Sequence, residues 1–140
     1  MIPAASAVAS TPLSHRTRVF VVDDAQMVRR LIIECLKEVP GLEVAGVAGS
    51  EATALAWLRS HPCEVLILDL ELRQGTGLGL LKTLAETDPE SKLVKIVYSN
   101  HVDDSTRHAA MELGAAHVFD KTLDIDNLRQ LLQDIAVSAS

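Results

Sequence analysis

The chain has 140 residues with a formal net charge of -6, and 48% of them are hydrophobic, although only one Trp, one Tyr and two Phe occur. This length fits one domain with an aliphatic core. The acidic balance argues against a nucleic-acid partner or an anionic membrane surface, since binding phosphate groups requires clustered Lys and Arg. No apolar run approaches ~20 residues, so no membrane-spanning helix is expected.

The first 17 residues are rich in Ala, Ser and Pro and carry no basic segment ahead of an apolar run. This composition predicts a disordered N-terminal tail at residues 1–17 rather than a secretory signal. One domain is expected over residues 18–137, followed by a C-terminal tail at 138–140. Cys35 and Cys63 are too few for a disulfide framework, and Cys35 lies on an apolar helix stripe. This cysteine usage favours a reducing, cytoplasmic location.

Short apolar runs alternate with helical periodicity through the rest of the chain. The expected strands cover residues 19–24, 43–48, 65–69, 93–99 and 116–121, and a helix is expected after each of them. Five such βα units require crossover helices and a parallel sheet. The sequence therefore predicts an α/β protein with a doubly wound five-stranded parallel sheet in the order 2-1-3-4-5, the flavodoxin-like arrangement.

Polar side chains stand at the carboxyl ends of four of these strands. They are Asp23 and Asp24, Asp69, Ser99 and Lys121. In an open parallel sheet these ends meet in one crevice. Three carboxylates brought together raise each other's pKa, and a hard cation such as Mg²⁺ relieves their repulsion. A carboxylate nucleophile beside a metal ion and a lysine is suited to phosphoryl transfer.

With these residues in this order, the chain resembles the receiver domains of two-component response regulators. The motifs that carry the resemblance are Asp23-Asp24, Leu68-Asp69-Leu70, Ser99, Gly114-Ala115 and Lys121. The resemblance implies that Asp69 is the phosphoacceptor. It further implies a Mg²⁺ ion held directly by Asp24 and Asp69, through water by Asp23, and by the backbone carbonyl of Glu71. Ser99 and Lys121 would contact the phosphoryl group and act as the switch.

The implied partner is a histidine kinase or a histidine phosphotransfer protein. The chain is expected to be a stand-alone receiver that catalyses only its own phosphorylation and dephosphorylation. Its output would be contact with a target protein, a relay step or a phosphate sink, with a homodimer through the fourth and fifth βα units as a further possibility.

The chain departs from the family pattern around the switch. Thr122 stands where Pro usually follows the lysine, so a trans Lys121–Thr122 bond is expected. Val118 stands at the usual aromatic position, with Phe119 one place later, and Asn100 replaces the usual small residue. These differences affect the usual account of signalling through an aromatic side chain, but they leave the phosphorylation chemistry unchanged.

Glu71 and His101 stand at the positions that flank the path of the hydrolytic water in receivers. We expect them to modulate the lifetime of the phosphoryl group, with His101 pairing with Glu71 across the site. The dephosphorylation rates of Glu71→Ala and His101→Ala variants test this hypothesis.

Other interpretations stay open. Asp23-Asp24 alone would be taken as an N-cap for the helix starting at Gln26. Asp69-Leu70-Glu71 is similar to the acid pair of haloacid-dehalogenase-type phosphatases, but Leu72 and Arg73 follow where that family has Thr or Val. A receiver-like interaction module that does not use phosphate is the stronger alternative.

Overall fold

The computed structural model of the protein describes residues 16–139, so most of the expected N-terminal tail lies outside the described residues. The strands are β1 (Thr17–Val22), β2 (Leu42–Ala48), β3 (Val65–Leu68), β4 (Val94–Ser99) and β5 (His117–Asp120). The helices are α2 (Gln26–Lys37), α3 (Glu51–Ser60), α4 (Gly77–Thr87), α5 (Asp104–Glu112) and α6 (Ile125–Ala139).

The five strands form one parallel sheet in the order β2-β1-β3-β4-β5, which confirms the predicted fold class and strand order. Val22 pairs with Leu68, and Leu68 pairs with Val97 in the next strand. This register brings the carboxyl ends of the three central strands to the same edge of the sheet. Polar residues that follow these strands are therefore neighbours in space.

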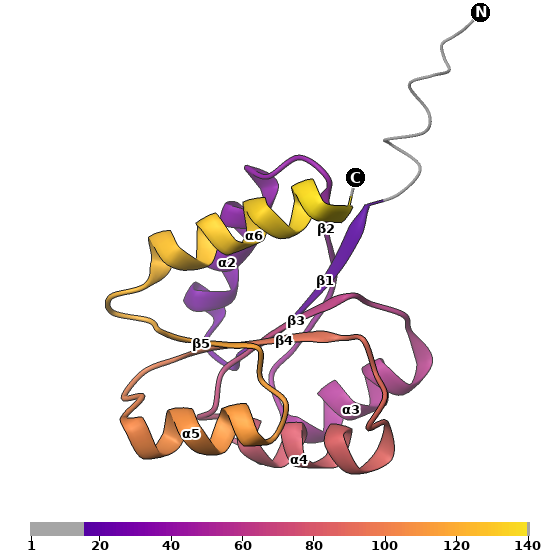
Figure 1. The fold of residues 1–140 in the computed structure, drawn as a ribbon, viewed down its shortest axis with the longest axis vertical. Coiled ribbons are helices and arrows are strands. Elements are labelled where there is room, and N and C mark those ends of the chain that lie inside the picture. The colour runs from indigo at the N-terminus through magenta and orange to yellow at the C-terminus, as the bar shows by residue number, and fades with distance from the viewer. Residues whose placement is uncertain (1–15, 140) are drawn as a thin grey trace, which may run out of the picture.

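Helices cover both faces of the sheet, with α2 and α6 on one side and α3, α4 and α5 on the other (Figure 1). Along β3, Val65 and Ile67 face the α2–α6 core, while Leu66 and Leu68 face the α3–α4–α5 core. All four side chains are buried, as a central parallel strand with helices on both faces requires. Both cores are mainly aliphatic, in agreement with the composition.

Polar caps fix the start of three helices. Ser50 accepts a hydrogen bond from the backbone of Thr53 at α3, and Thr76 and Asp103 do the same at α4 and α5. Helix α2 differs, because its N-cap residue is Ala25 and no side chain caps it. The interpretation of Asp23-Asp24 as a helix cap is therefore wrong. The backbone N–H of Ala25 instead bonds to Asp23 in the turn before the helix.

The ends of the described fold differ slightly from the expected domain limits of 18 and 137. Strand β1 begins at Thr17, whose N–H donates a hydrogen bond to the carbonyl of Gly41 at 2.8 Å. Helix α6 continues to Ala139.

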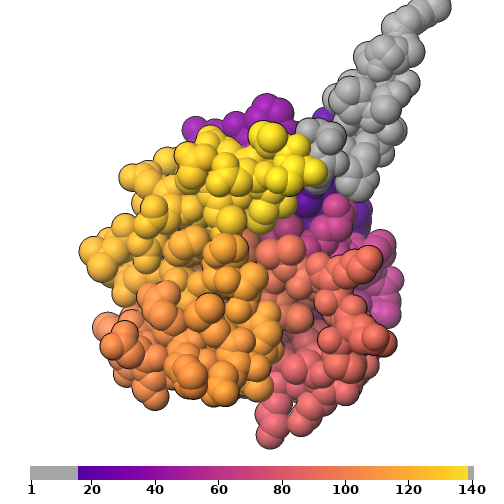
Figure 2. Space-filling view, viewed as in Figure 1, coloured from indigo at the N-terminus to yellow at the C-terminus, as the bar shows by residue number. Residues whose placement is uncertain are grey.

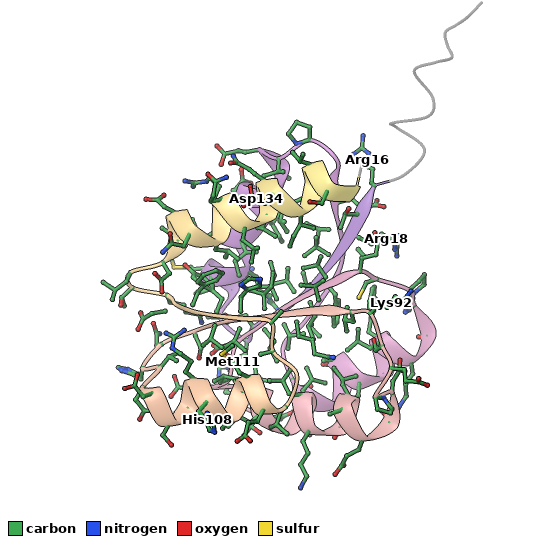
Figure 3. All side chains as sticks on the ribbon, viewed as in Figure 1. Arg16, Arg18, Lys92, His108, Met111 and Asp134 are labelled. Atoms are coloured by element: carbon green, nitrogen blue, oxygen red, sulfur yellow. The ribbon has the colours of Figure 1, made fainter. Side chains whose placement is uncertain are left out.

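In Figure 2, α5 and α6 cover much of the visible face. Polar side chains such as Asp134 on α6 and His108 on α5 lie on the outside of the helices (Figure 3). Within the described residues, no helix is long and apolar enough to cross a membrane.

Trp57 on α3 joins that helix to the edge of the sheet. Its ring stacks on Phe20 of β1 with a centroid distance of 4.1 Å and on His61 with a distance of 4.6 Å. The ring also lies over Gly46 of β2, where a Cβ atom would come within 2.7 Å of the indole nitrogen. The pairing of β1 with β2 shifts at Val19/Phe20, beside this glycine. The close approach of Trp57 therefore requires glycine at position 46.

Gly46→Ala should lower the free energy of unfolding by about 1–3 kcal/mol, because the added methyl group forces the Trp57 ring out of its stack. Gly49→Ala is the matched control, since its Cβ would meet its nearest neighbour at an ordinary 3.5 Å. Urea unfolding of both variants measures the difference. Equal stability of the two variants would show that the Trp57 ring moves without cost.

Candidate functional site

Backbone hydrogen bonds fix the positions of the strand-end residues. The N–H of Asp69 donates to the carbonyl of Val22 at 2.9 Å, and the N–H of Asp23 donates to the carbonyl of Ala48 at 3.0 Å. On the other side, the N–H of Lys121 donates to the carbonyl of Ser99 at 3.0 Å. The sheet ladder thus extends one residue beyond the strands and holds these polar residues in one row.

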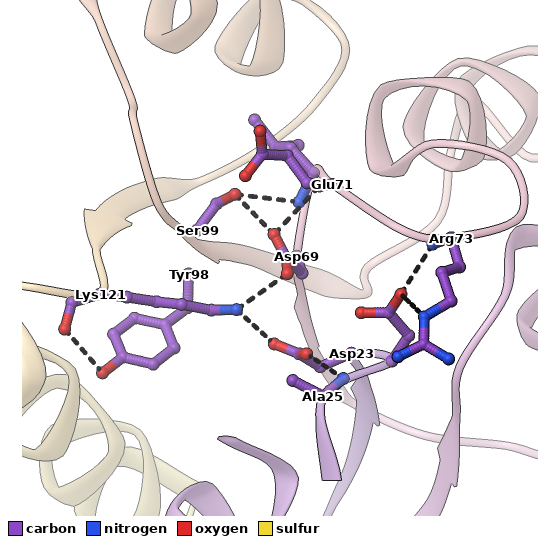
Figure 4. Close-up of polar contacts among 10 residues, drawn as sticks. Asp23, Ala25, Asp69, Glu71, Arg73, Tyr98, Ser99 and Lys121 are labelled. Carbon is purple, nitrogen blue, oxygen red and sulfur yellow. Dashed lines mark hydrogen bonds and ion pairs between the residues drawn. The ribbon is translucent and has the colours of Figure 1, made fainter. Parts of the chain in front are cut away.

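Asp69 lies at the centre of the site, and its side chain is only 7% exposed. Its Oδ1 atom accepts hydrogen bonds from the Ser99 hydroxyl at 2.6 Å and from the Glu71 N–H at 3.0 Å. Its Oδ2 atom accepts a hydrogen bond from Lys121 Nζ at 2.8 Å. Figure 4 shows these three donors converging on the carboxylate. Sequence reasoning placed Asp69, Ser99 and Lys121 together, and the structure does bring them into contact.

The Lys121 ammonium lies between two buried carboxylates. Besides its bond to Asp69, Nζ lies 2.7 Å from Asp23 Oδ2, and the Asp23 side chain is 1% exposed. Burial raises the pKa of Asp23, although Lys121 and the Ala25 N–H act against this. Burial alone would lower the pKa of Lys121, but its contacts with Asp23 and Asp69 outweigh that effect and raise it. The lysine is therefore held in its charged form.

Asp24 has a different partner. Its Oδ2 atom accepts a hydrogen bond from the backbone N–H of Arg73 at 2.7 Å, and the Arg73 Nε atom lies 3.8 Å away. The Asp24 side chain is 23% exposed, so it forms the solvent side of the acidic cluster. Arg73 belongs to the loop between β3 and α4. This contact ties the loop to the end of β1.

The acidic cluster fits a divalent cation. Asp23, Asp24 and Asp69 each offer a carboxylate oxygen, and these atoms lie within 4.8 Å of one another. Asp23 Oδ2 is buried and accepts no hydrogen bond of good geometry, even though the lysine lies beside it. Hard cations such as Mg²⁺ prefer oxygen ligands of this kind. The donor set can therefore hold such an ion.

A glycine at the start of α4 shapes the loop beside Asp69. A Cβ atom at Gly77 would overlap the carbonyl oxygen of Asp69 and lie 2.7 Å from the Cα of Leu70. The Gly77 N–H donates to the carbonyl of Leu70 at 3.0 Å, which closes the loop. The glycine-containing segment thus forms the loop after Asp69 and the first turn of α4. The closeness of Gly77 to Asp69 was not predicted, although the Gly-Thr-Gly sequence was the available signal.

The switch region combines expected and unexpected features. The described chain contains no cis peptide bond, which confirms the trans Lys121–Thr122 bond. Val118 is 5% exposed and packs into the α3–α4–α5 core. Its carbonyl accepts a hydrogen bond from Arg107 of α5 at 2.6 Å. Phe119 is partly buried against the opposite core, while Asn100 is exposed. The two neighbouring residues Val118 and Phe119 therefore face opposite sides of the sheet.

The expected pairing of Glu71 with His101 is wrong for this structure. Both residues are exposed, and no ion pair or hydrogen bond between them is found among the described residues. The backbone of His101 adopts a positive φ of 55° in the loop after β4. Nearby, at the end of β5, hydrogen bonds from Thr122 lower the pKa of Asp120.

Comparison with known families gives a clear result. The response regulator receiver domain matches residues 19–133. The chain belongs to this family. Receiver domains accept phosphoryl groups in two-component signalling and interact with histidine kinases, so the resemblance inferred from the motifs is confirmed at the level of the family.

Two curated relatives show how much of a longer protein the chain matches. The protein-glutamate methylesterase/protein-glutamine glutaminase of Halalkalibacterium halodurans is 33% identical over 134 residues, which cover 91% of this chain and 38% of that protein. The DNA-binding transcriptional activator DevR/DosR of Mycobacterium tuberculosis is 29% identical over 123 residues, covering 88% of this chain and 56% of that protein. The chain thus spans only part of these relatives.

A solved structure supports the fold. The response regulator domain of Thermotoga maritima CheB superimposes with a TM-score of 0.75 at 20% identity, covering 89% of this chain and 96% of that one. At this identity the likeness concerns the fold alone.

Lys121→Met should lower the free energy of unfolding in the absence of divalent cations by about 3 kcal/mol, because two buried carboxylates lose their shared cation. Lys82→Met on the exposed surface of α4 is the matched control and should change stability by less than about 0.5 kcal/mol. Adding Asp23→Asn to Lys121→Met should restore part of the loss. Urea unfolding provides the measurement, and equal stability of the two lysine variants would contradict the role of the ion-pair network.

Proposed function

We propose that the protein receives a phosphoryl group from a phosphohistidine on the Asp69 carboxylate. The observation that carries this proposal is the convergence of three donors on Asp69 beside two further carboxylates. Such an arrangement supplies a nucleophile, groups that neutralise a transferred phosphoryl group, and ligands for a cation. The match to the receiver family supports the same assignment.

In the proposed reaction, an Asp69 oxygen attacks the phosphorus of the phosphohistidine. The new O–P bond forms while the P–N bond breaks, and the phosphohistidine, protonated on its other ring nitrogen, leaves as a neutral imidazole. Asp23, Asp24, Asp69 and the backbone carbonyl of Glu71 would hold Mg²⁺. When bound, this ion neutralises charge on the transferring group. Lys121 provides a second positive charge next to the nucleophile, with Nζ already 2.8 Å from Asp69 Oδ2.

The same donors couple phosphorylation to the rest of the domain. Ser99 and Lys121 bond to Asp69 before any transfer, and a phosphoryl group adds roughly two negative charges at this point. Both donors then turn to phosphoryl oxygens. Ser99 ends β4 and leads to α5, and Lys121 follows β5 and leads to α6. Their displacement biases the packing of the fourth and fifth βα units.

The energies involved are sufficient for such a switch. Reversing a 1:99 population requires about 5.5 kcal/mol of differential interaction. Hydrogen bonds to charged groups contribute about 1.5–3 kcal/mol each, so two or three contacts in the upper part of this range reach this value. We propose that the output is contact with a protein partner, a relay step or a phosphate sink. The methylesterase and DNA-binding relatives suggest that receivers of this sequence type serve more than one kind of output.

Incubation with Mg²⁺ and acetyl phosphate, followed by intact-mass spectrometry, tests the assignment. The wild-type chain should gain one labile phosphoryl group. Asp69→Asn should gain none, because an amide is not a carboxylate nucleophile. Asp88→Asn, an exposed residue after α4, is the matched control and should behave like the wild type.

Two results would contradict the proposal. One is a labile phosphoryl group at wild-type level on the Asp69→Asn variant. The other is a wild-type chain that stays unmodified both with acetyl phosphate and with a phosphorylated histidine phosphotransfer protein, which would favour an interaction module that does not use phosphate.

A further inference from the structure

Arg73 is the cation that contacts the solvent side of the acidic cluster. Its Nε atom lies 3.8 Å from Asp24 Oδ2, and its own backbone N–H donates to the same oxygen at 2.7 Å. Figure 4 shows the Arg73 side chain bent back toward this carboxylate. One residue thus approaches Asp24 with both its backbone dipole and its full positive charge.

Each of the three carboxylates of the site contacts one of two cations, Lys121 or Arg73. Lys121 contacts Asp23 and Asp69, and among the described residues the salt-bridge partner of Asp24 is Arg73. They differ in accessibility, because the Lys121 side chain is 10% exposed and the Arg73 side chain is 88% exposed. Lys121 is therefore a fixed part of the site, whereas the Arg73 guanidinium is free to leave Asp24 for solvent.

We propose that Arg73 acts as a resident counter-cation of the acidic cluster, which competes with Mg²⁺ for Asp24 and so sets the concentration at which the site binds the metal. This inference rests on the metal site of the proposed function. Before metal binds, the guanidinium offsets part of the repulsion among the carboxylates. A divalent cation near Asp24 then meets a positive charge that must move away, which lowers its affinity.

The rest of the loop is anchored independently of the Arg73 side chain. The N–H of Thr76 donates to Glu51 of α3 at 2.9 Å, and the N–H of Glu51 donates to the carbonyl of Gln74 at 3.1 Å. The Gly77–Leu70 hydrogen bond closes the same loop. A change of the Arg73 side chain therefore leaves the loop in place. It also keeps the backbone hydrogen bond to Asp24, so that charge is the main property altered.

The expected effect is moderate and depends on salt. An exposed charge a few ångströms from a divalent ion changes its affinity by about threefold to tenfold at low ionic strength. At several hundred millimolar salt the screening length falls well below ~10 Å, so the effect should shrink. A purely structural role of Arg73 would not produce this salt dependence.

The test is a Mg²⁺ titration of the full chain without phosphodonor, followed through backbone amide NMR signals of Ala25 and of residue 73. Arg73→Gln removes the charge and keeps the backbone N–H, and Arg73→Lys keeps the charge. Arg59→Gln is the matched control, because Arg59 is exposed in the last turn of α3 and has the same charge. Titrations at low and high NaCl complete the set.

The proposal predicts that Arg73→Gln binds Mg²⁺ about threefold to tenfold more tightly than the wild type at low salt. Arg73→Lys and Arg59→Gln should stay within about twofold of the wild type, and the gain should diminish at high salt. Unchanged affinity in Arg73→Gln, or an equal gain in Arg59→Gln, would overturn the role of Arg73 while leaving the metal site intact. A wild-type chain and an Arg73→Gln variant that both fail to bind Mg²⁺ would overturn the metal site itself, and this inference with it.

Discussion

Two buried carboxylates share one ammonium group at the carboxyl edge of the sheet, and the arrangement of the site depends on this contact. Asp23 and Asp69 are 1% and 5% exposed, and each lies within 2.8 Å of Lys121 Nζ. Leaving either charge without a partner in such a place costs several kcal/mol. The lysine must therefore remain between the two carboxylates until another cation binds there or a phosphoryl group is added to Asp69. This requirement makes the site sensitive to added charge.

The fold supplies the rigid frame for this contact. Parallel pairing of β1, β3 and β4 places the residues after each strand in one row, and two cores hold the strands from both faces. The loops that follow these strands complete the site. The loop after β3 carries Arg73 to Asp24, and the loop after β4 contains the positive φ of His101. Strand ends fixed by the sheet, with loops that carry further polar groups to them, suit a site that must bind ions and respond to a transferred group.

The sequence was sufficient to predict the strand order and the meeting of Asp23, Asp69, Ser99 and Lys121. Both predictions follow from general rules, because apolar runs separated by helices require a parallel sheet and parallel strands end at one edge. The sequence was not sufficient to predict contacts made by loops. The Arg73–Asp24 contact, the overlap that excludes a side chain at Gly77, and the positive φ of His101 depend on loop backbone conformation, which hydrophobic periodicity does not encode.

The most direct test of the account is a crystal structure of the chain with Mg²⁺ and beryllofluoride, a stable mimic of a phosphoryl group. The account predicts the mimic on an Asp69 carboxylate oxygen, with Ser99 Oγ and Lys121 Nζ moved from Asp69 to its fluorine atoms. It also predicts the metal ion among Asp23, Asp24, Asp69 and the Glu71 carbonyl. A mimic bound elsewhere, or bound to Asp69 while Ser99 and Lys121 keep their present contacts, would contradict the account.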